Sequence, residues 1–146
     1  MGGINVGRWL AGGVAAAVVI FAVEGISSVF YIDQMTGSLA ALGLEMDMTG
    51  LARGLAVLVS LISGLVLVFF YAAARPRFGP GPRTAILVAV VLWFGSHLLF
   101  LIGYQMVGIY PTSLLVMWGA VGIVEMIVAA LVGGWIYKEA ELPQTE

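Results

Sequence analysis

The chain has 146 residues, of which 62% are hydrophobic and 10% are charged. Soluble globular domains average about 45–50% apolar and about 25% charged residues, so this composition excludes a soluble domain and indicates an integral membrane protein. The absence of cysteine excludes disulfide scaffolds, thiolate metal centres and cysteine nucleophiles. A net charge of −2 provides no general attraction to nucleic acid, so no nucleic-acid partner is expected.

Four apolar segments are each long enough to cross a bilayer, which takes about 20 mostly apolar residues. The predicted spans are residues 10–31, 51–71, 84–104 and 113–137. Few residues remain for a separate soluble domain. The sequence therefore predicts an all-α fold, a four-transmembrane-helix bundle in which residues 1–146 form a single integral membrane domain.

The basic residues are distributed unevenly between the two ends of the predicted spans. One side has five of them, and the other has only Arg53. The five are Arg8, Arg75, Arg77, Arg83 and Lys138. The positive-inside rule then places both termini in the cytoplasm.

The segment between the first two spans carries acidic but no basic residues before position 50. Within it, residues 38–44 are expected to form either one or two helical turns on the bilayer surface or an ordinary loop. In the helical case, Thr36 or Ser38 is the expected N-cap.

Residues 75–83 combine basic side chains with alternating Pro and Gly, which predicts a stiff turn that ends the second helix. Two roles are open for Arg75, Arg77 and Arg83. They either contact anionic lipid headgroups, at about 1 kcal/mol each, or only set the orientation of the protein.

Small residues mark the expected contacts between helices, because membrane helices associate through close backbone approach. They recur in the first and last spans: Gly12, Gly13, Ala16, Ala17, Gly122, Ala129, Ala130, Gly133 and Gly134. Residues 18–21 and 34–35 also resemble 90–93 and 105–106, which would fit two duplicated helical hairpins.

Three ionisable residues lie deep in the apolar segments: Glu24, His97 and Glu125. At 1.5 Å per helical residue they fall within one narrow slab of depth, to which the second span adds Ser60 and Ser63. An ionised carboxylate at the bilayer centre costs about 2.5–3.5 kcal/mol even on the lenient insertion scale, so these side chains are expected to face the bundle interior. The five residues form the predicted intramembrane polar cluster.

Several roles for this cluster are open. Glu24 could simply be neutralised by Arg53, with the other polar groups bonded across helix interfaces. The cluster could instead bind protons or an organic cation. His97, flanked by aromatic residues, could hold one axial position of a haem or pigment. A metal site is not expected, because the sequence lacks Glu-x-x-His and His-x-x-x-His pairs. Catalysis is not expected either, because no nucleophile and base form a recognisable motif and no phosphate loop is present.

Two resemblances follow from these residues. Glu24 in the first span, residues 71–82 (YAAARPRFGPGP) and Glu125 before residues 135–139 (WIYKE) resemble a group of small, uncharacterised bacterial integral membrane proteins over nearly the whole chain. The turn is the most specific part. This resemblance implies a multi-pass protein of the bacterial inner membrane and no particular activity.

Residues 22–28 (AVEGISS) are similar to the glutamate region of small multidrug resistance transporters, and Pro111, Trp118 and residues 122–124 are similar to their third helix. That resemblance implies that Glu24 exchanges protons for organic cations. The pattern departs from that family because the latter residues lie in the last span and because Glu125, His97 and the long outer loop are additional.

The principal functional hypothesis is a non-enzymatic accessory or structural subunit of a larger bacterial membrane assembly, contacting lipid and other subunits or further copies of itself. The first alternative is a proton-coupled or cation-binding transporter that uses Glu24 and Glu125. The second alternative is a haem or pigment carrier that uses His97. No cofactor is expected under the first two.

Overall fold

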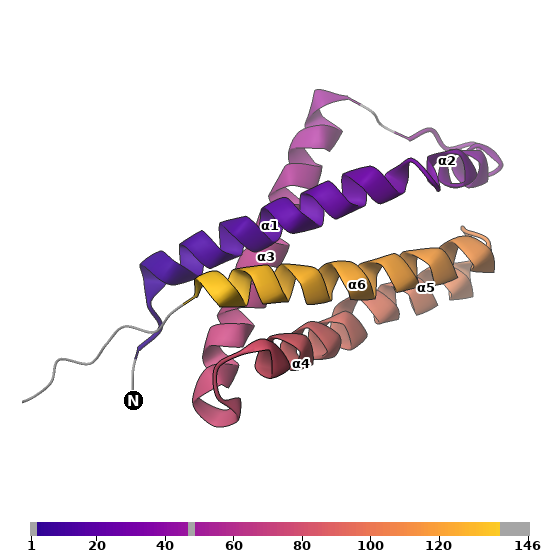
Figure 1. The fold of residues 1–146 in the computed structure, drawn as a ribbon. Helices are drawn as coiled ribbons and strands as arrows, with labels where there is room; N and C mark the ends of the chain where they lie inside the picture. Colours follow the sequence, from indigo (N-terminus) through magenta and orange to yellow (C-terminus); the bar gives the residue numbers. More distant parts are fainter. Residues whose placement is uncertain (1–2, 47–48, 138–146) are drawn as a thin grey trace, which may run out of the picture.

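The computed structural model describes residues 3–46 and 49–137, and all regular elements in this part of the chain are helical. The elements are α1 (Val6–Ser28), α2 (Ile32–Ala40), α3 (Gly50–Phe78), α4 (Pro82–Leu92), the π-helix η1 (Trp93–Leu98), α5 (Leu99–Val107) and α6 (Thr112–Ile136). Figure 1 shows α1 and α6 side by side, with α3 crossing behind them.

Four helices are long and apolar enough to cross a membrane: Val6–Ser28, Gly50–Phe78, Pro82–Val107 and Thr112–Ile136. The third of these is continuous from α4 through η1 to α5. The predicted all-α fold with four spans is thereby confirmed, and the chain is a small multi-pass integral membrane protein. The first span begins earlier than predicted because the Asn5 side chain caps it, accepting a hydrogen bond from the Arg8 amide at 3.1 Å.

The predicted turn over residues 75–83 is wrong in its first half, because α3 continues through Pro76 to Phe78. Proline removes one backbone donor, but this close to the end of a helix the loss is confined to the last turn. The connection itself is short and depends on Gly79 and Gly81, whose φ angles of +80° and +117° favour glycine.

The segment after α1 does contain a helix, but α2 begins at Ile32 and ends at Ala40, so it starts earlier than predicted. The expected N-cap role of Thr36 or Ser38 is wrong, because both hydroxyls donate to carbonyls inside α2. In Figure 1, α2 is turned sharply away from the axis of α1, as a helix lying along a bilayer surface would be.

Close contact between α1, α3 and α6 depends on small residues. A Cβ atom placed on Gly12 would lie 2.6 Å from the Gly133 carbonyl oxygen of α6, and one on Gly13 would lie 2.6 Å from Leu65 Cδ2 of α3. Gly64 of α3 meets the α1 backbone around Ala17 in the same way, a contact that the sequence pattern did not indicate. Only hydrogen at these positions allows the backbones to approach this closely.

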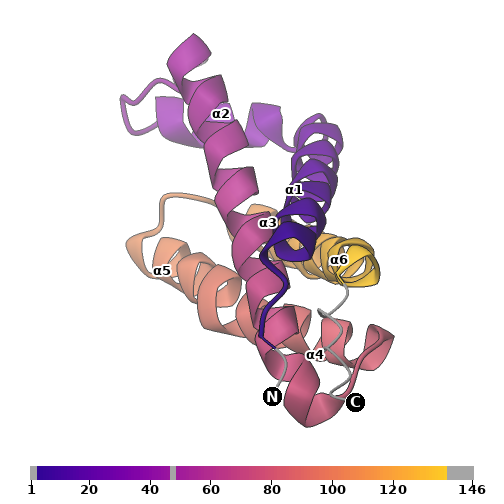
Figure 2. The ribbon, with the colours of Figure 1, turned by 90° about the vertical axis from the view of Figure 1, so that its left-hand side faces the viewer.

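The buried core lies toward the end of the bundle that holds Asn5 and Tyr137, here called the terminal end. The Asn5 amide donates to the Tyr137 hydroxyl at 3.4 Å there. The core is formed by Ala16, Ile20, Leu67, Val68, Tyr71, Ala72, Ala85, Val88, Ala89, Ala129, Ala130 and Tyr137. Toward the opposite, far end the helices separate, and the Gly50 end of α3 rises away from the others (Figures 1 and 2). The space between the separating helices contains the polar residues.

Candidate functional site

A cavity of about 710 Å³ lies between the long helices beyond the core. All five residues of the predicted polar cluster line it, together with two further serines. The ionisable and hydroxyl-bearing lining residues are Glu24, Ser28, Ser60, Ser63, Ser96, His97 and Glu125. The walls thus come from α1, α3, η1 and α6. We call this space the carboxyl cavity.

Glu125 is the most enclosed ionisable group of the cavity, with 9% of its surface exposed. Its Oε2 atom is buried and has no hydrogen-bond partner in the structure. Two small residues on the same face of α6, Gly122 and Ala129, are also buried. The α6 helix thus places a carboxyl oxygen of Glu125 in the cavity without a hydrogen-bond partner. Leaving a buried polar atom unpaired costs free energy in a medium of low dielectric constant.

Glu24 lies in the last turns of α1 and is more exposed than Glu125. The Tyr31 hydroxyl donates a hydrogen bond to Glu24 Oε1. Tyr31 is 3% exposed. Burial, and after it the nearby Glu24 carboxylate, raises the pKa of Tyr31 above its usual value, so the hydroxyl remains a donor at neutral pH. Tyr31, the last residue of the first predicted span, thus holds the Glu24 carboxylate in place through a hydrogen bond.

His97 lies on η1, where the helix makes the wider π turn. Such local widening changes the direction of side chains and is frequent at functional sites. The His97 ring stacks on Trp93, with centroids 6.4 Å apart, and its Nε2 atom is 3.3 Å from the Trp118 carbonyl oxygen. A Cβ atom on Gly122 would lie 2.6 Å from Nε2, so a glycine at that position makes room for the imidazole.

The serine hydroxyls of the cavity are mostly bonded to their own helices. Ser60 donates to the Ala56 carbonyl at 3.0 Å. Ser96 donates to the Leu92 carbonyl at 2.6 Å. Ser96 was not predicted. It lies on the π turn and lines this cavity, and its place beside His97 in the sequence was the one available signal.

A second cavity of about 470 Å³ adjoins the first and shares Glu24, Ser28 and His97 with it. Its other walls are rich in aromatic rings, and we call it the aromatic cavity. The Trp118 ring is central, with its centroid 5.6 Å from Tyr31 and 4.9 Å from Tyr110. The Trp118 Nε1 donor is buried without a hydrogen-bond partner. Glu24 and His97 therefore stand where a carboxylate-lined space meets an aromatic one.

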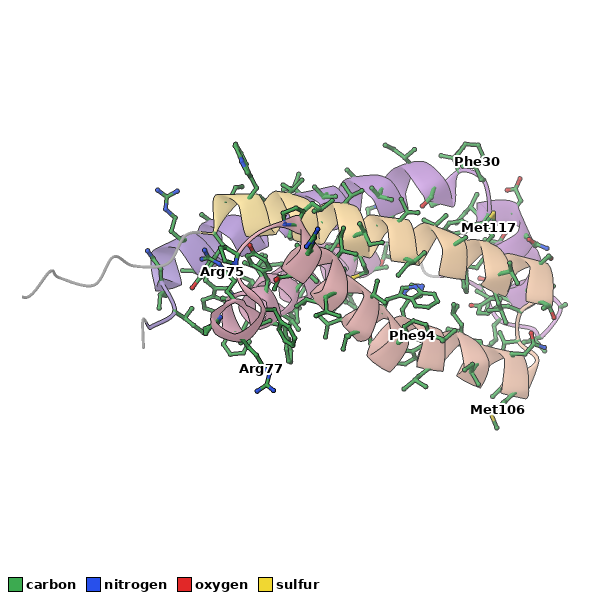
Figure 3. The ribbon with its side chains drawn as sticks, turned by 60° about the horizontal axis from the view of Figure 1, so that its bottom comes forward. Phe30, Arg75, Arg77, Phe94, Met106 and Met117 are labelled. Atoms are coloured by element: carbon green, nitrogen blue, oxygen red, sulfur yellow. The ribbon has the colours of Figure 1, made fainter. Side chains whose placement is uncertain are left out.

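The basic residues lie away from both cavities. Arg53 is exposed on α3 and forms no ion pair with Glu24 in the described part of the chain. Arg75 is half-buried, with its Cζ atom 5.9 Å from the Tyr71 ring centroid and 5.3 Å from that of Tyr137. Figure 3 shows Arg75 among the side chains at the terminal end, whereas Arg77 points outward.

Arg83 is also exposed, so Arg77 and Arg83 are accessible to lipid headgroups. The lipid-contact role of the three arginines stays a prediction. Lys138, which contributed to the orientation prediction, lies outside the described residues.

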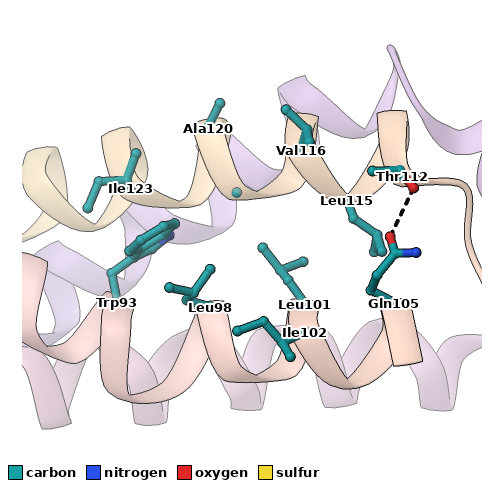
Figure 4. Close-up of a pocket in the computed structure, with 11 residues that line it drawn as sticks. Trp93, Leu98, Leu101, Ile102, Gln105, Thr112, Leu115, Val116, Ala120 and Ile123 are labelled. Carbon is teal, nitrogen blue, oxygen red and sulfur yellow. Dashed lines mark hydrogen bonds between the residues drawn. The ribbon is translucent and has the colours of Figure 1, made fainter. Parts of the chain in front are cut away.

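A third cavity, of about 380 Å³ between α5 and α6, has a different character (Figure 4). It is lined mainly by apolar side chains and contains no ionisable group. Its polar feature is the hydrogen bond that Thr112 donates to Gln105 at 3.0 Å. This bond fastens the connection between the two helices and offers little for ligand recognition.

The arrangement does not favour a metal or an axial haem ligand. Among the described residues, no group of three or more His, Cys, Asp or Glu side chains is placed to hold a metal ion. His97 Nε2, a common ligand atom, is directed at the Trp118 carbonyl and bounded by Gly122. The side chains available to a ligand are two carboxyls and several hydroxyls beside aromatic rings. They are better suited to binding protons or an organic cation.

Comparisons of the chain with protein-family models, curated proteins and solved structures found no match. Both resemblances based on sequence therefore stay predictions, and so does the proposed duplication of two helical hairpins.

Proposed function

We propose that the protein binds a cation within the bilayer in exchange for protons, and that it acts as a small, non-catalytic transport protein. One observation carries the proposal: Glu24 and Glu125 line the same cavity, and neither forms an ion pair with a basic side chain among the described residues. The carboxyl cavity thus contains acidic groups without built-in neutralising charge.

The exchange of a cation for protons follows from the free-energy cost of a buried charge. An ionised carboxylate inside a membrane protein is costly unless a proton or a cation compensates it. A cation that enters between Glu24 and Glu125 takes over the compensation, so a proton can leave. Protons and cation then compete for one site, so each lowers the apparent affinity of the other.

The test uses purified full-length protein in phosphatidylcholine nanodiscs. Two probes, 2-phenylethylammonium and its N,N,N-trimethyl derivative, are titrated in weakly buffered solution while a pH indicator records proton release. We expect saturable binding of at least one probe, accompanied by proton release. Glu24→Gln and Glu125→Gln should each abolish the release and weaken binding at least tenfold.

Glu45→Gln is the matched control, because Glu45 is exposed in the loop after α2 and lines neither cavity. It should leave binding and proton release unchanged. The proposal fails if neither probe binds the wild-type protein, or if the two cavity variants release protons as the wild type does.

A second candidate function is an accessory subunit of a larger membrane assembly. It is favoured by the first turns of α3, where large apolar side chains are exposed: Leu51 is 71% exposed and Leu55 is 51% exposed. Such a surface suits a neighbouring protein as well as lipid. Gentle extraction and native mass spectrometry should then give a complex with other subunits, whereas an isolated monomer would exclude this role.

We further propose that the protein resides in a bacterial inner membrane with both termini in the cytoplasm. The absence of cysteine makes this easy to test, since single cysteines can be introduced without a background. Ser38→Cys on α2 should react with an impermeant maleimide in intact cells. Gly79→Cys in the connection after α3 should react only after lysis, and the reverse pattern would overturn the orientation.

A further inference from the structure

The carboxyl cavity offers its ligand mostly hydrogen-bond acceptors. The hydroxyls of Ser28, Ser60 and Ser96 each donate their proton to a carbonyl of their own helix, at 2.8, 3.0 and 2.6 Å. A hydroxyl has one proton, so the oxygen of each serine can only accept a further bond. Ser63 also lines the cavity, and its hydroxyl forms no hydrogen bond in the described part of the chain, so it is the one serine here that can donate as well as accept.

The remaining polar groups of the cavity follow the same pattern. The Glu125 Oε2 atom is buried without a partner, and it becomes a free acceptor when the proton leaves on binding of the cation. At the boundary with the aromatic cavity, which Tyr31 lines, the Tyr31 hydroxyl already donates its hydrogen bond to Glu24. His97 Nε2 lies 3.3 Å from the Trp118 carbonyl oxygen, which can only accept, so the Nε2 hydrogen is directed to that carbonyl and away from a ligand.

The adjoining aromatic cavity supplies the complementary apolar surface. Trp118 meets the rings of Tyr31, Tyr104 and Tyr110 in edge-to-face contacts, with centroids 4.9–6.4 Å apart. The buried donor of this region, Trp118 Nε1, belongs to the aromatic cavity and does not line the carboxyl cavity. A ligand that spans the shared boundary at Glu24 would therefore meet acceptors at one end and rings at the other.

We propose that the ligand is a protonated primary amine that carries an apolar group. Its ammonium lies between Glu24 and Glu125 and donates its three N–H bonds to carboxylate and serine oxygens, while the apolar group lies against the rings around Trp118. This inference rests on the proposed function and narrows it to a substrate class. A quaternary ammonium has the same charge but no N–H donor, so it leaves the acceptors unsatisfied.

Isothermal titration calorimetry on the full chain in phosphatidylcholine nanodiscs compares 2-phenylethylammonium with its N,N,N-trimethyl derivative. We expect the primary amine to bind at least tenfold more tightly. Ser60→Ala and Ser96→Ala should each weaken binding of the primary amine at least threefold and leave binding of the trimethyl derivative unchanged.

Ser38→Ala is the matched control, because the Ser38 hydroxyl donates to the Gln34 carbonyl at 2.8 Å within α2 but lines neither cavity. It removes the same type of local hydrogen bond without removing an acceptor from the site. This variant should bind the primary amine as tightly as the wild type does. If its affinity falls as much as that of Ser60→Ala, the serine oxygens of the cavity do not act as acceptors for the ammonium, and the inference is wrong.

The outcomes separate this inference from the proposed function. If the trimethyl derivative binds as tightly as the primary amine and releases protons, cation binding stands and the primary-amine inference is wrong. If neither probe binds, the proposed function itself fails, and the inference fails with it.

A primary ammonium could come from a free amine or from the headgroup of phosphatidylethanolamine. Nanodiscs containing this lipid distinguish the two sources. Weaker binding of 2-phenylethylammonium in them, relative to phosphatidylcholine alone, supports the inference with the lipid as ligand. Equal binding supports it with a free amine as ligand.

Discussion

Replacing Gly12 by alanine tests the close contact between α1 and α6. The added Cβ would lie 2.6 Å from the Gly133 carbonyl oxygen and 3.2 Å from Val68 Cγ1, whereas ordinary contacts begin at 3.4 Å. A backbone oxygen within a helix cannot rotate aside, so the helices must separate by about 0.8 Å. Overpacking of this kind costs about 1–3 kcal/mol.

Alanine also stabilises a helix relative to glycine, by about 0.8–1.0 kcal/mol, and this gain must be separated from the steric cost. Gly25→Ala on the same helix provides the control, because a Cβ atom there meets nothing within 4 Å. The free energy of unfolding of Gly12→Ala should therefore lie below that of Gly25→Ala by about 1–3 kcal/mol.

Reversible unfolding in mixed detergent micelles, followed by far-UV circular dichroism, measures both variants against the wild type. If Gly12→Ala proves as stable as Gly25→Ala, the contact between α1 and α6 does not depend on the absence of a side chain at position 12. The reasoning about small residues at this crossing would then be refuted.

Two further predictions concern the site. Gly122→Ala should displace the His97 ring, break its contact with the Trp118 carbonyl and weaken binding of 2-phenylethylammonium at least threefold by calorimetry; unchanged affinity would show that His97 need not occupy this position. Because the pKa of Tyr31 is raised, its contribution to the free energy of unfolding should be constant below about pH 10 and fall above it, since tyrosine loses its proton first in the unfolded chain. Tyr31→Phe should make this alkaline fall shallower in pH-dependent unfolding, and an identical slope would contradict the burial of a Tyr31 hydroxyl bonded to Glu24.

Much of the architecture could be predicted because it depends on local properties of the chain. An apolar segment of sufficient length is a membrane helix whatever its neighbours are, so the number of spans follows from composition and length alone. Depth accumulates at 1.5 Å per residue, so the common depth of Glu24, His97 and Glu125 could also be calculated. The ends of the helices could not be predicted as closely as their number. Capping by Asn5 and the continuation of α3 through Pro76 extend these helices beyond their most apolar parts.

The tertiary structure decided which side chains meet. The direction of a side chain around its helix depends on how neighbouring helices pack, and the fit of Gly12 against Gly133 is a property of two distant segments. Ser96 and His97 both lie on the π turn of the third span and line the same cavity, and neither the π turn nor this placement could be predicted from local sequence.

The sequence by itself thus determined a four-span bundle with polar groups at one depth, because hydrophobicity and helical rise are local quantities. Only the tertiary structure placed the two carboxyls, the imidazole and the aromatic rings around two adjoining cavities, because that arrangement depends on where tightly packed helices begin to separate.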